Sequence, residues 1–169
     1  MKPDLKEALA NNLKKGMLEF MATYPDEFQH LLELALSKDK EYAWRAAWLL
    51  TKCMKKNDPR VAAYIDTMIN QLDEVPDGLK RELMNVLLLV EMDEDQLGEL
   101  YNKCVQAWEK TTSIPSVRVR AFQLMFKIAA SYPELYHEIR LLTEEHYLAS
   151  LSPGIRNTVV KLLQSIQEE

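Results

Sequence analysis

The chain has 169 residues, of which 47% are hydrophobic and 28% charged, a composition typical of a globular protein with a substantial core. Only four glycines occur, and Leu, Ala, Glu and Lys are abundant, which favours helices over strands. We therefore expect one all-α domain over residues 1–169. The net charge of −5 disfavours broad nucleic-acid binding, because a phosphate backbone requires an excess of Lys and Arg on at least one face.

Targeting and redox signals are consistent with a cytoplasmic protein. The start MKPDLKEALANNLKK carries charges throughout and lacks the apolar run of a secretory leader, and no stretch has the uncharged length of a membrane span. Cys53 and Cys104 lie within apolar helical patterns without CxxC spacing, so we expect reduced core thiols. These observations predict a cytoplasmic location and no membrane contact.

Apolar residues at three- and four-residue intervals predict about nine helices, arranged in antiparallel pairs. Proline and polar turns separate them, and Asp58 is expected to cap the fourth, with Pro59 in its first turn. The ninth is unpaired, and its polar end is typical of a terminal cap that faces water. The predicted helices span residues 4–22, 28–35, 41–56, 58–72, 79–92, 94–110, 114–130, 133–149 and 155–166.

Four arginines mark a repeat. Arg45, Arg81, Arg118 and Arg156 follow one another at intervals of 36, 37 and 38 residues. Positions −1, +3, +6 and +7 from each arginine are often apolar and form one helical stripe, which predicts the packing face. A helix pair of this length is too small to bury its own apolar face, so neighbouring units must stack.

The segments VRVRAFQLM at 117–125 and IRNTVVKLL at 155–163 resemble the first helix of HEAT and armadillo-like repeats, which often carries Asp-Val-Arg-x-x-Ala-x-x-x-Leu. WRAAWLLTK and KRELMNVLL are weaker matches, and the acidic residue before the Val-Arg pair is absent. By register the resemblance covers residues 25–166. It implies an α-α superhelix similar to short uncharacterised bacterial HEAT-like proteins, with no activity attached.

No catalytic or metal-binding motif is present in the sequence. The three histidines His30, His137 and His146 form no HExxH pattern, and the last two, nine residues apart, do not share the close face of a helix. Carboxylates at 73–74, 93–95 and 144–145 are adjacent in sequence and hence diverge around a helix, as at helix ends. We expect no enzymatic activity, no catalytic residues, no metal and no cofactor.

Two surface features have more than one interpretation. Trp44 and Trp48 lie four residues apart on one helical face, where they could stack on bases or grip a peptide. That face is also the predicted packing stripe, so we favour core filling. The basic set Lys52, Lys55, Lys56 and Arg60 could meet phosphate, and it could equally offset the dipole of a helix C-terminus.

The leading functional hypothesis is a non-enzymatic scaffold whose second helices, residues 58–72, 94–110 and 133–149, line a concave surface for a protein or peptide. The alternative is nucleic-acid binding resembling that of the DNA-alkylation repeats. It requires Arg60, Lys103 and Arg140 to gather on one side. The sequence names neither the partner nor an oligomeric state.

Overall fold

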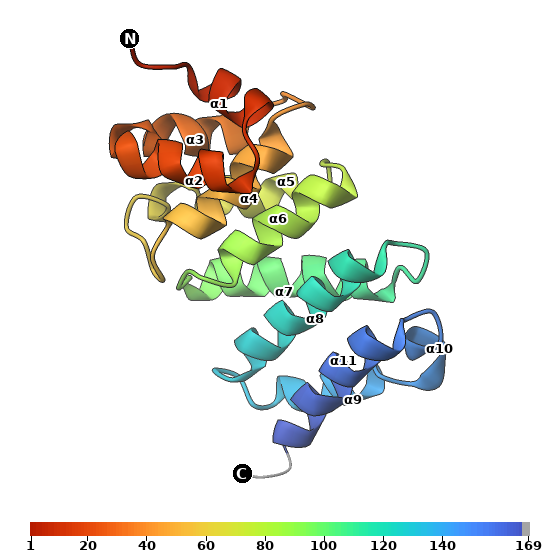
Figure 1. Ribbon diagram of the computed structural model, residues 1–169. Coiled ribbons are helices and arrows are strands. Elements are labelled where there is room, and N and C mark those ends of the chain that lie inside the picture. The colour runs from red at the N-terminus through yellow and green to blue at the C-terminus, as the bar shows by residue number, and fades with distance from the viewer. Residues whose placement is uncertain (167–169) are drawn as a thin grey trace. The chain divides into compact units, whose positions relative to one another are not determined.

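The computed structural model describes residues 1–166, which form α-helices and two short 3-10 helices without a strand (Figure 1). The all-α prediction is confirmed. The helices are α1 (Leu5–Asn11), α2 (Lys14–Thr23), η1 (Pro25–Glu27), α3 (Phe28–Ala35), α4 (Ala43–Cys53), η2 (Ala62–Tyr64), α5 (Ile65–Gln71), α6 (Asp77–Leu87), α7 (Glu94–Glu109), α8 (Pro115–Ala129), α9 (Leu135–Leu141), α10 (Glu145–Leu148) and α11 (Pro153–Ser165).

The chain divides into two compact units, Met1–Glu91 and Met92–Glu169, which we call unit 1 and unit 2 and describe separately. Helices α1 to α6 belong to unit 1, and α7 to α11 belong to unit 2. The expectation of one domain over residues 1–169 stays a prediction.

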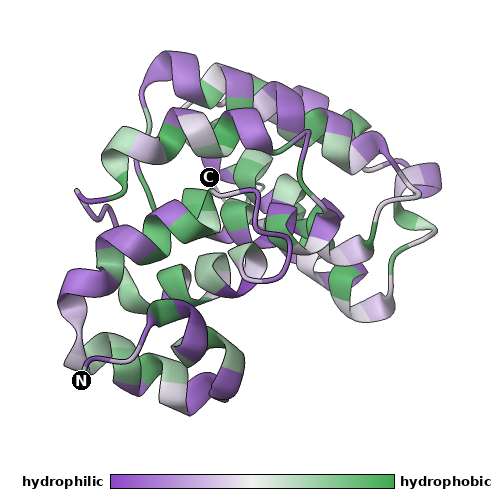
Figure 2. Ribbon diagram, turned by 90° about the horizontal axis from the view of Figure 1, so that it is seen from above, coloured by the Kyte–Doolittle hydropathy of each residue, from purple (hydrophilic) through white to green (hydrophobic). Residues whose placement is uncertain are grey.

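In unit 1, α4 is the central helix and packs against α2, α3 and α6. Its inner face combines small and branched residues, Ala46, Ala47, Leu49 and Leu50, all of which are buried. The alanines let the neighbouring helices approach closely, and the leucines fill the space between them. Along the helices of Figure 2, hydrophobic and hydrophilic residues alternate, as expected for helices with one buried side.

In unit 2, α7 and α8 form an antiparallel hairpin joined by residues 110–114, and α8 also packs against α9 and α11. Asp93 and Gln96 form a capping box that begins α7, and Pro115 begins α8. The rings of Trp108 and Phe122 lie 4.8 Å apart between these two helices. Helix α11 has the exposed outer side predicted for a terminal cap.

Three predicted helices are each divided into two pieces in the structure, and the predicted helices 41–56 and 79–92 are shortened to α4 and α6. The predicted helix 4–22 breaks at Asn12, whose backbone is extended and whose side-chain amide donates to the Ala8 carbonyl at 2.9 Å. The predicted helix 58–72 becomes η2 and α5, because Asp58 accepts from nearby groups in a turn and does not cap a helix. The predicted helix 133–149 divides into α9 and α10, since the Leu142 carbonyl accepts the indole N–H of Trp108 at 2.7 Å.

The four repeat arginines occupy equivalent places, each within the first turn or so of α4, α6, α8 or α11. The predicted packing stripe is correct for α8, where Val117, Ala121, Leu124 and Met125 are buried. It is wrong for α4. There the same positions include the exposed residues Trp44 and Lys52, because the alanine-rich side of the helix faces the core.

Candidate binding site

Unit 1 contains a cleft of about 390 Å³ between the start of α2 and the outer faces of α4 and α6. Its walls combine aromatic, aliphatic and cationic side chains. The lining residues are Asn12, Leu13, Lys14, Met17, Trp44, Arg45, Trp48, Arg81 and Glu82. A concave surface with this mixture of apolar and charged groups is suited to binding rather than to packing within the chain.

Two tryptophans form the centre of this cleft. Trp44 is 42% exposed, and Trp48 is partly buried one helical turn further along α4. The core-filling interpretation is therefore wrong for Trp44 and holds only in part for Trp48. The third tryptophan, Trp108, is fully buried in unit 2.

Cationic groups surround the two indoles. The Lys14 ammonium lies 5.7 Å from the ring centre of Trp48, and that of Lys52 lies 5.9 Å from the same ring. The Arg45 guanidinium lies 5.6 Å from the ring of Trp44. Distances below about 6 Å allow cation–π attraction, which is modest at exposed sites. Among residues 1–166, no carboxylate forms an ion pair with Lys14 or Lys52.

Two further contacts fix the arginines of the cleft. Arg45 donates through Nη1 to the carbonyl of Leu9, which ties α4 to the end of α1. Arg81 donates through Nε and Nη2 to Oε1 of Glu82, at 3.0 and 2.8 Å. Glu82 is only 4% exposed and also accepts from Asn85, so its charge is neutralised locally. The lining thus carries three cations and one already paired carboxylate.

Charge is segregated between the two kinds of helix in the repeat. We call α4, α6, α8 and α11 the A helices, and α5, α7, α9 and α10 the B helices. The A helices carry nine basic and two acidic residues: Arg45, Lys52, Lys80, Arg81, Arg118, Arg120, Lys127, Arg156, Lys161, Asp77 and Glu82. The B helices carry two basic and seven acidic residues: Lys103, Arg140, Asp66, Glu94, Asp95, Glu99, Glu109, Glu138 and Glu145.

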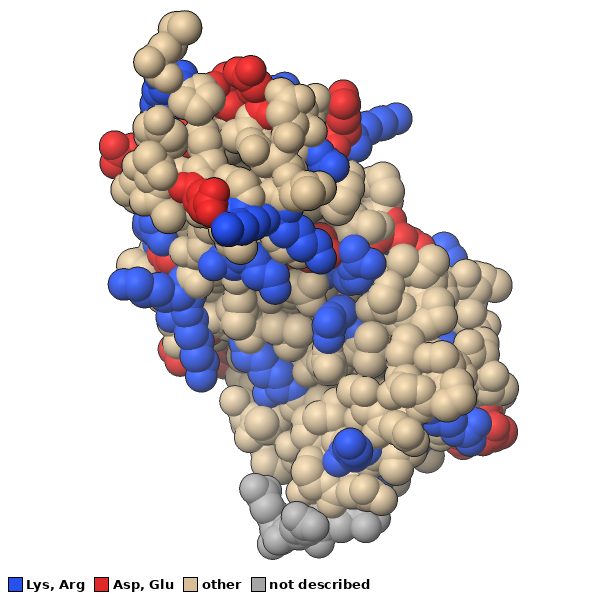
Figure 3. Space-filling model, in the orientation of Figure 1, with Lys and Arg blue, Asp and Glu red and all other residues tan. Residues whose placement is uncertain are grey.

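The basic side is visible on unit 1. In Figure 3, Lys and Arg side chains gather over the part of unit 1 that α2, α4 and α6 occupy in Figure 1. Few Asp or Glu side chains interrupt this patch. The chain is acidic as a whole, so this surface is a local exception to the net charge of −5.

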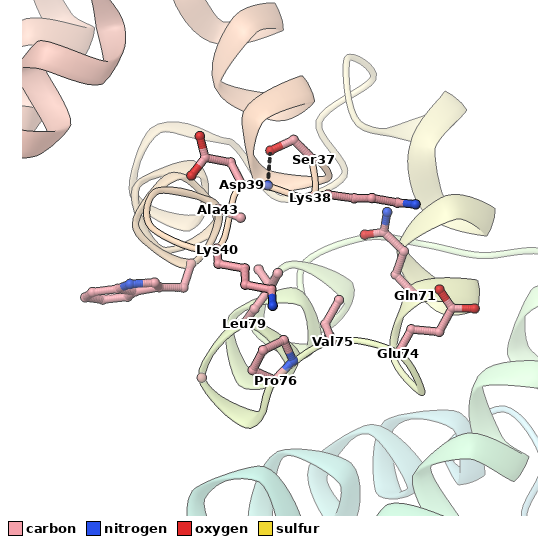
Figure 4. A pocket seen from close by; sticks show the side chains of 12 residues that line it. Ser37, Lys38, Asp39, Lys40, Ala43, Gln71, Glu74, Val75, Pro76 and Leu79 are labelled. Carbon is pink, nitrogen blue, oxygen red and sulfur yellow. Dashed lines mark hydrogen bonds between the residues drawn. The ribbon is translucent and has the colours of Figure 1, made fainter.

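A second cavity of about 340 Å³ adjoins the cleft, and Trp44 lines both. It lies between the α3–α4 loop and the α5–α6 loop, and in Figure 4 the Lys40 side chain extends across it toward Pro76 and Leu79. Asp39 is engaged elsewhere, because its carboxylate accepts from the Lys6 ammonium at 2.7 Å and from two backbone N–H groups. The cavity extends the apolar surface around Trp44.

Two of the three cations that phosphate binding requires, Arg60 and Lys103, already lie beside carboxylates. Arg60 donates to both carboxylate oxygens of buried Asp58, at 2.9 and 2.7 Å, and its guanidinium stacks on Phe28 at 3.4 Å. These hydrogen bonds hold the pKa of the Asp58 carboxyl well below its usual range. Lys103 lies 3.9 Å from Glu99. The basic set predicted between Lys52 and Arg60 is also divided. Lys52 lies beside Trp48, whereas Arg60 is paired with Asp58.

Histidines and cysteines are dispersed. His30 contacts Glu27 at 2.9 Å, and His146 lies 3.8 Å from Glu144. Cys53 and Cys104 are both free, and burial raises the pKa of each thiol. Within residues 1–166, no cluster of three His, Cys, Asp or Glu residues could hold a metal ion.

Arg118 is the most deeply buried of the repeat arginines. Its guanidinium is fully enclosed in unit 2 and lies 4.5 Å from the ring of Trp108. It donates to the Trp108 carbonyl at 2.8 Å, to Ser150 Oγ at 2.9 Å and to the Tyr147 carbonyl at 2.6 Å. Because its guanidinium is fully enclosed and bonded to three groups of unit 2, this residue is structural.

Paired helices repeated at near-constant length, with an arginine at an equivalent place in each first helix, define the class of α-helical repeat proteins. The family model described as HEAT repeat domain matches residues 1–166, and the chain belongs to this family. The predicted HEAT-like resemblance is confirmed. No curated protein and no solved structure matches the chain. In the described part of the chain, no helix is both long enough and apolar enough to span a membrane.

Proposed function

We propose that the protein is a non-enzymatic binding module for a protein or peptide, and that the cleft of unit 1 is part of its binding surface. Helical repeats present extended surfaces built from successive units, which suits them to contact other chains. The observation that supports this proposal most directly is the exposure of Trp44 in a cleft with cationic walls. Leu13, which lines the same cleft, is 87% exposed. Aromatic side chains in such positions commonly anchor a partner.

The proposed binding surface lies on the first helices of the repeat, whereas the sequence predicted it on the second helices. The exposed Trp44 and the partly buried Trp48 lie on α4, an A helix. Packing explains the change. Helix α4 buries its alanines and leucines, so its bulky aromatic residues point away from the core.

Selection from a random peptide library displayed on phage tests the proposal. Peptides enriched on the full chain should lose binding to the Trp44→Ala variant by about tenfold or more, because truncating an aromatic anchor typically costs 2 kcal/mol or more. Leu141→Ala is the control, since Leu141 is also exposed but lies on α9. Peptides that bind both variants equally, or a library that yields no Trp44-dependent peptide, would contradict the proposed function.

The cytoplasmic location is also a proposal. It is supported by two cysteines that are free in the structure, an arrangement suited to a reducing compartment. Imaging the chain fused to a fluorescent protein in its native cell would test it. Accumulation outside the cytoplasm would count against it.

A further inference from the structure

We propose that the occupant of the cleft is an acidic peptide segment that carries an aromatic or aliphatic anchor residue. This inference rests on the proposed function, because it specifies the chemistry of the partner at the same surface. Two observations carry it: the sign of the charge around the cleft, and the apolar surface at its centre.

Lys14 and Lys52 set the sign of the charge around Trp48. Both ammonium groups lie over the ring of Trp48, and no carboxylate of residues 1–166 pairs with either one. Arg45 uses one guanidinium nitrogen for the Leu9 carbonyl, which leaves further N–H donors on the same group. Carboxylates of a partner would supply the counter-charges that the chain itself does not provide here.

Apolar side chains line the cleft beside these cations. Leu13 and Trp44 are exposed, and Met17 lies at the base of the same cleft. Indole and thioether groups accommodate varied side-chain shapes, so one Phe or Leu of a partner could lie between the tryptophans. The acidic neighbours of such an anchor would then lie within reach of the surrounding lysines.

The same features fit a nucleic acid less well. Base stacking would use the tryptophans, but a duplex requires a broad and continuous row of cations. Arg81 is already paired with Glu82, and Arg60 with Asp58. A chain of net charge −5 also repels an extended polyanion more strongly than it repels a short peptide. We therefore commit to the peptide and make nucleic acid an outcome of the test.

Fluorine NMR on the full chain labelled with 5-fluorotryptophan provides the readout. The three tryptophans give separate probes, two in the cleft and one, Trp108, fully buried in unit 2. The ligand is a synthetic peptide of glutamates around one phenylalanine. It should shift the Trp44 and Trp48 signals in a saturable way and leave the Trp108 signal in place. Replacing its glutamates with glutamines should weaken binding about tenfold, and added salt should weaken it further.

Two double charge reversals form a matched pair. Lys14→Glu with Lys52→Glu reverses the two cations that lie over the Trp48 ring, and we expect it to lower the affinity for the glutamate peptide about tenfold. Lys55→Glu with Lys56→Glu makes the same change in net charge on the exposed loop after α4, outside the cleft, and should leave the affinity nearly unchanged. All four lysines are surface residues. Circular dichroism would verify that both variants keep their helices.

The inference is overturned if the glutamine peptide binds as tightly as the glutamate peptide, or if both double variants weaken binding equally. It is also overturned if a DNA duplex shifts the Trp44 and Trp48 signals at lower concentration than the peptide. Library peptides that require Trp44 but lack acidic residues would contradict the acidic partner while supporting the proposed function. The absence of any Trp44-dependent peptide would contradict the proposed function itself.

Discussion

The four arginines of the repeat show that one sequence position can serve four purposes. Arg45 donates to the Leu9 carbonyl, Arg81 to the neighbouring Glu82 carboxylate, and Arg156 to Glu145. Arg118 is fully buried and bonds to two carbonyls and a hydroxyl. The spacing in the sequence located all four positions. It could not supply their partners, because several of the acceptors are backbone or loop groups placed only by tertiary folding.

Replacing Arg118 tests its structural role. Arg118→Ala removes three hydrogen bonds and leaves buried acceptors without a donor, so we expect the free energy of unfolding to fall by about 3 kcal/mol or more. Arg156→Ala is the control, because its pair with Glu145 is exposed and should contribute at most about 1 kcal/mol. Urea unfolding would measure both. Equal losses in the two variants would contradict the role of burial.

Asp58 provides a prediction about pH. Its pKa is lower in the folded chain than in the unfolded chain because Arg60 stabilises the carboxylate. The pair therefore stabilises the fold above the unfolded pKa of about 4, and this contribution disappears as the pH falls through the folded value. Asp58→Asn should lower the free energy of unfolding by about 2 kcal/mol at neutral pH and flatten its dependence on pH below about 4.

The control for this experiment is Asp26→Asn, which changes an exposed carboxylate in the same unit. Chemical denaturation at a series of pH values would compare the two variants with the original chain. An Asp58→Asn variant whose stability falls as steeply in acid as that of the original chain would contradict the prediction.

At the scale of the helix, local signals predicted most elements well and failed where tertiary contacts intervene. Helix α7 begins at Glu94, as predicted, and α8 begins at Pro115, one residue after the predicted start. The division between α9 and α10 was not predicted, because it depends on the bond from Trp108, 34 residues earlier, to the Leu142 carbonyl. The sequence predicted the wrong buried face for α4. Alanine contributes weakly to a hydrophobic pattern, although it lets helices pack closely.

The capping box of α7 gives a prediction at this scale. Asp93→Ala removes an acceptor for the Gln96 N–H, at 2.9 Å, and should lower the free energy of unfolding by about 1 kcal/mol. Asp93→Asn retains a good cap and should have little effect. Thermal unfolding followed by circular dichroism would distinguish them. If the alanine variant were as stable as the asparagine variant, the cap would not contribute.

At the scale of the whole molecule, the sequence identified the repeat but not the candidate site. The net charge of −5 does not reveal the contrast between the basic A helices and the acidic B helices, because the charges of the two sets nearly cancel when they are added. The contrast could have been found by counting charges separately for each helix of the pair. The cleft itself could not, because it depends on residues from α2, α4 and α6 that only folding brings together.

Local stability should follow packing within each unit. We expect the backbone amides of α4 and α8 to exchange most slowly with deuterium, because each of these helices packs against several others. Helix α1 and the four-residue α10 should exchange fastest. Hydrogen exchange read by mass spectrometry would test this order. Protection of α1 equal to that of α8 would contradict it.

The bonds of Arg118 also bear on how unit 2 folds. A hairpin of α7 and α8 formed first would enclose a guanidinium with the Trp108 carbonyl as an acceptor but without Tyr147 and Ser150, which follow later in the chain. In such a hairpin, water would solvate the guanidinium N–H groups until Tyr147 and Ser150 replaced it as acceptors. The three bonds of Arg118 are therefore complete only when α7, α8, α10 and the residues just after α10 are all in place.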